Sequence, residues 1–179
     1  WVKFSPHSYA GTARRLHNWV GLDGSDFLGV GSHLKYYIEE GQTFNDITPI
    51  RTTTSAGDVT FSATNGSNIV TVTDAGHSAI ANDFVTFSGA ASLGGNVTAA
   101  ILNAEHQVTR FVSSAQYEIQ VSVTASSSDS GNGGGSTVGT YQINTGLDNT
   151  VGGTGFGAGQ YGGTTSGAVS TTINEGGTY

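Results

Sequence analysis

Residues 18–50 read NWVGLDGSDFLGVGSHLKYYIEEGQTFNDITPI, and this stretch decides the fold. Two short apolar runs, 27–31 and 34–38, are separated by residues that favour turns, and this pattern predicts antiparallel strands joined by tight connections. Gly24 supplies the positive φ that the turn before the first run needs. Residues 39–42 turn the chain again, and 44–50 continue as an extended segment into Pro49. Hairpins of this kind are the parts from which propeller blades are built, so the stretch indicates a building element more than a catalyst.

The composition of the whole chain agrees with an all-β protein. The 179 residues include 28 Gly, and only 11% of the side chains are charged. Such a chain has many turns and is not a helix bundle. Cys is absent, which excludes disulfides and thiolate metal sites. No apolar run reaches the roughly 18 residues of a membrane helix. The chain opens on Trp1 and contains no Met, so we expect it to be part of a longer or processed polypeptide.

The net charge of −7 is unevenly distributed along the sequence. Residues 1–51 hold five of the six basic side chains and five acidic ones, so this part is neutral. From residue 52 onward, Arg110 is the one base against eight acids. A surface that grips phosphates needs clustered Lys and Arg. We therefore expect no tight nucleic-acid binding, although DNA could pass the acidic part without adhering.

Composition divides the chain into successive segments. Their order is a β-hairpin scaffold at 1–51, a linker at 52–57, a compact β-module at 58–125, a Gly/Ser loop at 126–136, a returning strand at 137–147, and a Gly-rich tail at 148–179 that needs a partner to bury its few aromatic rings.

The β-module shows a clear period of two. We expect strands at 58–63, 69–73, 83–88, 106–112 and 116–123, with a type I′ hairpin at Asn65–Gly66 and a loop with one helical turn at 96–105. The alternation places one set of side chains in the core: Val59, Phe61, Phe84 or Val85, Val108, Tyr117, Ile119 and Val121.

The motifs that could carry chemistry all have a simpler interpretation. Asp23–Asp26 lacks the further acids of a calcium loop and fits an ordinary turn. The five His residues have no metal-binding spacing. Gly155–Gly159 lacks the third Gly and the strand-to-helix context of a phosphate loop. Asp74, Asp83, Glu105 and Glu118 could serve as glycosidase carboxylates, but no spacing pairs any two of them. We therefore expect no catalytic, cofactor or metal residues.

Four segments together resemble a family of bacteriophage virion proteins, the tail-tube or tail-nozzle structural proteins of short-tailed phages. They are YAGTARRLHNW at 9–19, LDGSDFLGVGSHLKYYI at 22–38, FNDITPIR at 44–51 and TGFGAGQY at 154–161. The resemblance implies blade-like antiparallel hairpins, a partial β-propeller-like scaffold, with an inserted small β-sandwich or barrel at 58–145. A whole propeller needs at least four blades, and one and a fraction are present here.

The resemblance implies a non-enzymatic component of the phage tail, a nozzle or tube assembled as a symmetric ring. Its partners would be copies of itself and other tail, adaptor or portal proteins, and no membrane insertion is expected. The side chains expected at assembly interfaces are Trp1, Arg14, Arg15, Trp19, Tyr36, Tyr37, Phe156 and Tyr161. The alternative is a host-recognition or glycan-binding module of a tail or surface adhesin, in which exposed Tyr and Trp would stack on sugars. A hydrolase on a β-scaffold is a third hypothesis.

Overall fold

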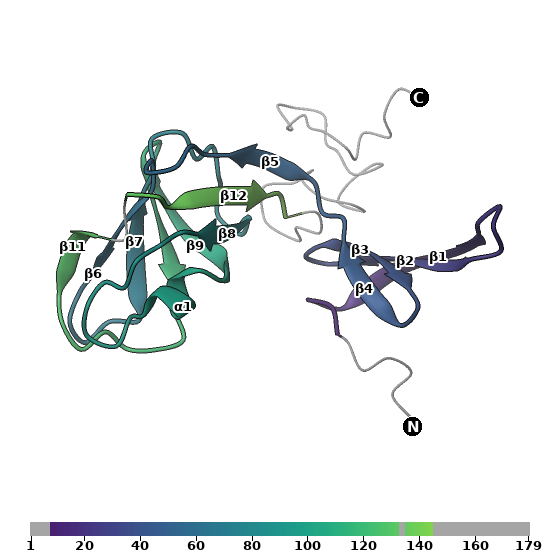
Figure 1. The fold of residues 1–179 in the computed structure, drawn as a ribbon, viewed down its shortest axis with the longest axis horizontal. Helices are drawn as coiled ribbons and strands as arrows, with labels where there is room; N and C mark the ends of the chain where they lie inside the picture. The colour runs from purple at the N-terminus through teal and green to yellow at the C-terminus, as the bar shows by residue number, and fades with distance from the viewer. Residues whose placement is uncertain (1–7, 133–134, 145–179) are drawn as a thin grey trace. The chain divides into compact units, whose positions relative to one another are not determined.

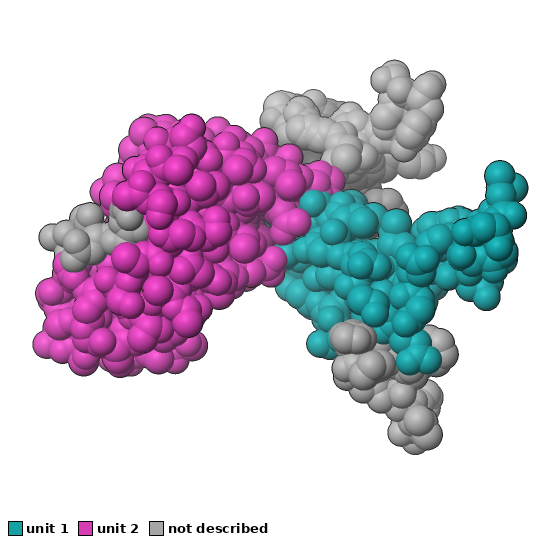
Figure 2. Space-filling view, in the orientation of Figure 1, with its two compact units in different colours: residues 1–48, 144–179 teal, residues 49–143 magenta. Residues whose placement is uncertain are grey.

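The computed structural model describes residues 8–132 and 135–144. The chain divides into two units, and of the described residues unit 1 holds 8–48 and 144, whereas unit 2 holds 49–132 and 135–143 (Figure 2). Every strand pair is antiparallel, so the predicted all-β class is confirmed. Trp1, Phe156, Tyr161, the 155–159 motif and the Gly-rich tail lie outside the described residues.

Unit 1 is a four-stranded meander. Its strands are β1 (Ala13–Val20), β2 (Asp26–Ser32), β3 (Tyr36–Glu40) and β4 (Thr43–Asp46), and each pairs with the next along the chain (Figure 1). Strand β1 is therefore an edge strand. The sequence did not predict it, because seven of its eight side chains are exposed and no alternation marks a buried face.

Strand β3 starts at Tyr36, two residues later than the run 34–38 predicted from the sequence. The Ser32 hydroxyl accepts the N–H groups of Leu34 (3.1 Å) and Lys35 (2.9 Å). These bonds fold residues 32–35 into a local turn, since a serine hydroxyl can take the place of a backbone acceptor. Leu34 and Lys35 consequently belong to the connection between β2 and β3.

Unit 2 contains one eight-stranded sheet and one helical turn. Its elements are β5 (Ile50–Thr53), β6 (Thr60–Ala63), β7 (Ile69–Thr73), β8 (Phe84–Ser88), α1 (Ala99–Leu102), β9 (Glu105–Ser113), β10 (Gln116–Gln120), β11 (Asp129–Asn132) and β12 (Val138–Gln142). The strand order is β11-β6-β7-β10-β9-β8-β12-β5. The helical turn predicted between 96 and 105 is confirmed as α1.

The sheet of unit 2 folds back on itself around β9. The first residues of β9, 105–107, pair with β8, whereas residues from Val108 onward pair with β10. Phe61 on β6 and Phe87 on β8 are far apart in strand order, yet their rings meet edge to face at 4.9 Å. The two halves of the sheet therefore enclose the core between them, and the sheet does not close into a barrel.

The core of unit 2 confirms the predicted inward residues. Val59, Phe61, Val85, Val108, Tyr117, Ile119 and Val121 are all buried, and Phe84 is buried as well. Further buried members come from the loops, from α1 and from β12, among them Leu93, Leu102 and Tyr141. The period-two pattern thus identified the correct faces of these strands.

Three local predictions in unit 2 differ from the structure. The chain between β6 and β7 spans 64–68, and only Gly66 of the pair has positive φ, so the predicted two-residue type I′ hairpin is wrong. Thr52 and Thr53 of the expected linker belong to β5 and pair with β12. Part of the expected Gly/Ser loop forms β11, which pairs with β6. In the last two cases, pairing with a distant strand overrides the local composition.

Candidate assembly surface

The β1–β2 hairpin of unit 1 is turned by residues 21–25. The N–H of Gly21 donates to the carbonyl of Ser25 (2.7 Å), and the N–H of Ser25 donates to Oδ1 of Asp23 (3.1 Å). Gly24 has a φ of 86° in open space, as the sequence predicted for this turn. The hydrogen bonds from Ser25 hold the pKa of Asp23 below its ordinary value, so this carboxylate is charged near neutral pH. Asp23–Asp26 thus forms a turn with a negative charge at its tip.

Apolar side chains of this hairpin stand in solvent. Leu16 is 58% exposed, Val20 63%, and Leu22 in the turn is fully exposed. Leu16 and Val20 share one face of the strand, because alternate residues of a strand point to the same side. A row of exposed aliphatic residues on an edge strand is unusual for a protein surface that contacts only water.

The opposite face of the hairpin carries a stack of rings. Trp19 stacks on Phe27 (centroids 5.4 Å apart) and on His17 (5.8 Å), and it remains 37% exposed. Trp19 also covers Gly29, where an added Cβ would lie 3.3 Å from its ring. Trp19 therefore packs against Phe27, His17 and Gly29 and is only partly open to solvent.

Residues 8–12 cover the other end of the unit 1 sheet. The ring of Tyr9 lies against Tyr37 (5.7 Å) and Phe44 (4.9 Å), and the Tyr37 hydroxyl accepts the N–H of Ala10 (3.1 Å). Among the described residues of unit 1, Val30 and Tyr37 are the hydrophobic side chains that become fully buried. The β1–β2 hairpin itself lacks such a cover within those residues.

The remaining buried groups of unit 1 are polar. Lys35 is 1% exposed and its Nζ donates to Oδ2 of Asp46 at 2.8 Å. Burial opposes ionisation of Asp46, but the bonds from Lys35 and Thr48 outweigh it and lower the pKa of Asp46 overall. Because the Asp46 carboxylate is partly exposed to solvent, this ion pair adds little stability and does not replace an apolar core.

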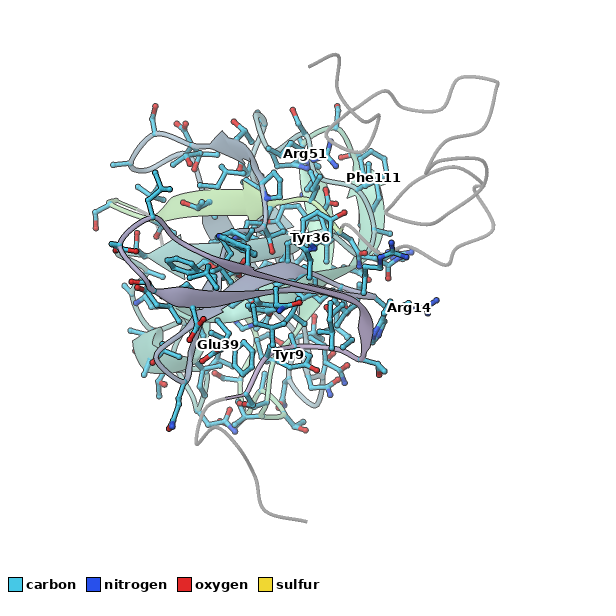
Figure 3. All side chains as sticks on the ribbon, turned by 90° about the vertical axis from the view of Figure 1, so that its right-hand side faces the viewer. Tyr9, Arg14, Tyr36, Glu39, Arg51 and Phe111 are labelled. Carbon is cyan, nitrogen blue, oxygen red and sulfur yellow. The ribbon has the colours of Figure 1, made fainter. Side chains whose placement is uncertain are left out.

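The residues expected at interfaces lie at different depths. Arg14, Arg15 and Trp19 are all on β1 and are exposed, and Arg14 extends away from the ribbon in Figure 3. Tyr36 is half-buried on β3, and Tyr37 is buried beneath residues 8–12. The structure therefore gathers three of the expected residues on one edge strand. Sequence reasoning missed Leu16, Asn18 and Val20, which complete that strand.

Unit 2 buries a chain of polar groups in its core. Tyr117 donates its hydroxyl proton to the Tyr141 hydroxyl (2.8 Å), which in turn donates to Oδ2 of Asp74 (2.5 Å). Oδ1 of Asp74 accepts the N–H of Gly76 (2.9 Å), and all three side chains are inaccessible to solvent. Burial raises the pKa of both tyrosines well above the ordinary value. The chain ties β12 to β10 and to the end of β7, which is a structural role.

His77 packs against this chain and is fixed on both ring nitrogens. Its Nδ1 accepts the N–H of Ala79 (2.9 Å), so Nε2 carries the proton and donates to the carbonyl of Ser113 (3.1 Å). The ring lies 5.0 Å from that of Tyr117. Among the described residues, no group of three His, Asp or Glu side chains is placed to hold a metal ion.

Three of the four carboxylates considered for hydrolysis are bonded to other side chains. Asp83 is buried and accepts two hydrogen bonds from Arg51, at 3.0 and 3.3 Å. Glu118 accepts two from Arg110, at 2.9 and 2.7 Å, and Asp74 is held by Tyr141. A glycosidase needs two carboxylates facing one sugar. These three acids face basic or phenolic partners instead.

The chain matches no protein-family model and no curated protein sequence. Among solved structures it is similar to an endosialidase of phage phi92, with a TM-score of 0.42 and 13% sequence identity. The match covers 67% of this chain and 18% of the endosialidase chain, so this chain spans less than a fifth of that protein. A likeness of this size identifies neither a family nor an activity. No helix among the described residues is long and apolar enough to cross a membrane.

Proposed function

We propose that this chain is a non-enzymatic structural component of a bacteriophage virion, placed in the tail and assembled with copies of itself in a symmetric ring. The observation that carries the proposal is the edge strand β1, which exposes Leu16, Trp19 and Val20. A surface of this kind is typical of a protein that completes its fold against a neighbour. The choice of a phage tail as the assembly rests on the sequence resemblance to phage tail-tube and tail-nozzle proteins.

The small apolar core of unit 1 supports the proposal that this unit is stabilised by contact with a partner. Burying one apolar side chain contributes roughly 1.5–3 kcal/mol, whereas ordering each backbone residue costs roughly 1–2 kcal/mol. Val30 and Tyr37 are the two hydrophobic side chains that the described part of unit 1 buries fully. Burial of the β1 side chains in an assembly would add the apolar contacts that this sheet needs.

The distribution of exposed rings speaks against the glycan-binding alternative. Tyr117 and Tyr141 of unit 2 are fully buried, and Phe61, Phe84 and Phe87 are buried as well. Within the described residues of unit 2, Phe111 is the aromatic side chain that solvent reaches substantially, and it is labelled in Figure 3. A single phenylalanine ring lacks the polar partners that orient a sugar.

The proposal is tested on purified particles of the phage that carries this sequence. An antibody raised against unit 2 should label one end of the virion, at the tail, in negatively stained particles. The infected-cell lysate is the control, because it shows that the chain is made. A chain that is abundant in the lysate and absent from purified virions contradicts the proposal.

A further inference from the structure

We propose that the outer edge of β1 pairs, antiparallel and about a two-fold axis, with β1 of a second copy, with Asn18 opposite Asn18. The inference rests on the proposed assembly role for its choice of partner. It goes beyond that role by naming the contact, its register and its symmetry.

The backbone of β1 has a row of N–H and C=O groups that point away from β2. Gly21 and Ser25 form a hydrogen-bonded pair, and such pairs alternate along an antiparallel ladder. In the observed register, Trp19 with Phe27 and His17 with Gly29 are then the bonded pairs. Leu16, Asn18 and Val20 therefore direct their N–H and C=O groups away from β2. Within the described residues no strand lies on that side, because β1 ends the sheet.

The side chains of β1 are complementary to themselves in one register. With Asn18 at the centre, Leu16 of each copy lies opposite Val20 of the other, so the two exposed aliphatic residues cover each other. On the other face, His17 lies opposite Trp19. Centring the pair on His17 would place Leu16 against Asn18, and centring it on Leu16 would place Arg15 against His17.

The charges of the hairpin favour the same arrangement. Arg14 and Arg15 stand at the start of β1, and Asp23 and Asp26 stand at the turn beyond its end. Antiparallel pairing about Asn18 brings the arginines of each copy beside the acidic turn of the other, whereas parallel pairing would align arginine with arginine. Asp23 is held in its charged form by Ser25, which keeps this attraction at mildly acidic pH.

The edge has little protection against such pairing. It contains no proline, and its charges and irregular register are confined to the start of the strand, at Ala13–Arg15. The residues that follow, 16–20, are in regular register with β2, and among the described residues β2 is the one strand that pairs with them. A two-fold contact closes on itself and gives a dimer, so a ring would need a second, different contact.

Cysteine cross-linking tests the register in the full chain, which has no native Cys. In the proposed dimer the two residues at position 18 form a bonded pair, with Cα atoms roughly 5.5 Å apart, within disulfide reach. Asn18→Cys should therefore give a covalent dimer under mild oxidation. Val20→Cys is the matched control, because its twin lies about four residues away along the strand, roughly 14 Å. An equal mixture of Leu16→Cys and Val20→Cys chains should yield the mixed dimer.

Sedimentation tests the association itself. The unmodified chain of 18.3 kDa should reach twice that mass as its concentration rises. Val20→Lys should raise the dimer dissociation constant by about tenfold or more, because it places a charge against Leu16 of the other copy. Ile47→Lys, at a 49% exposed site of unit 1 off this edge, should leave it unchanged.

A chain that stays monomeric, or Val20→Cys linking as fast as Asn18→Cys, overturns the inference. The outcome is separable from that of the proposed function. Particles that contain the chain while Asn18→Cys fails to link would reject this contact alone, whereas a linked dimer absent from virions would reject the tail role alone.

Discussion

Replacing Tyr141 by Phe removes the central hydroxyl of the buried chain in unit 2. The variant leaves Oδ2 of Asp74 without its phenolic donor and leaves the Tyr117 hydroxyl without its acceptor. A hydrogen bond to a charged group contributes roughly 1.5–3 kcal/mol, and a neutral one about 1 kcal/mol. We therefore expect Tyr141→Phe to lower the free energy of unfolding by about 3 kcal/mol.

Tyr117→Phe is the matched control for this prediction. It removes a hydroxyl from the same chain but keeps the bond between Tyr141 and Asp74, so its expected cost is about 1 kcal/mol. Both variants conserve ring packing in the core, which isolates the hydrogen bonds from cavity effects.

Urea unfolding followed by far-UV circular dichroism provides the assay. Trp1 and Trp19 both belong to unit 1, so tryptophan fluorescence would not report on unit 2. With a urea dependence of roughly 1–3 kcal/mol per molar, the Tyr141→Phe midpoint should fall by about 1–3 M. Equal costs for the two variants would refute the reasoning, because Asp74 would then gain nothing from Tyr141.

Three further predictions concern unit 2. The free energy of unfolding should fall above about pH 10 by roughly 1.4 kcal/mol per pH unit for each of Tyr117 and Tyr141, because their pKa values are raised in the folded chain and only the unfolded chain releases these protons. Urea titrations of the variant with Phe at both positions should show a flatter dependence on pH. Gly89→Ala should lower the free energy of unfolding by about 2 kcal/mol or more, since at a φ of 73° its Cβ would lie 2.5 Å from the Ser136 carbonyl oxygen. Gly66→Ala, where the Cβ would meet open space at a φ of 81°, should lower it by about 1 kcal/mol. Equal shifts of the melting temperature in the two variants would contradict this. Arg51→Ala should lower the free energy of unfolding by about 2 kcal/mol, because it removes the basic partner of the buried Asp83. Arg110→Ala, which removes the exposed ion pair with Glu118, should leave the unfolding midpoint unchanged. A larger loss of stability for Arg110→Ala than for Arg51→Ala would contradict this reasoning.

The sequence predicted the core of unit 2 because its strands are buried on one side. Val59, Phe61, Val108 and Ile119 follow a period of two, and each is buried. The same rule could not find β1, whose residues are exposed on both faces. It could not find β11 either, because a Ser/Gly-rich segment becomes a strand there through pairing with β6.

The candidate surface was only partly predictable for the same reason. Arg14, Arg15 and Trp19 were expected at an interface. Leu16, Asn18 and Val20 can be assigned to the same surface only once β1 is known to be an edge strand. The buried chain of Asp74, Tyr117 and Tyr141 joins residues far apart in sequence. No local spacing encodes such a contact, since the folded-back sheet alone brings β7, β10 and β12 together.

The most direct test of the tail proposal is the copy number of this chain in purified virions. Quantitative mass spectrometry of peptides from unit 2, referenced to the major capsid protein of the same particles, gives that number. A structural ring component should be present in a fixed, small multiple of copies per particle that survives a high-salt wash. A chain that is missing from the particles, or that washes away to a variable trace, would contradict the account.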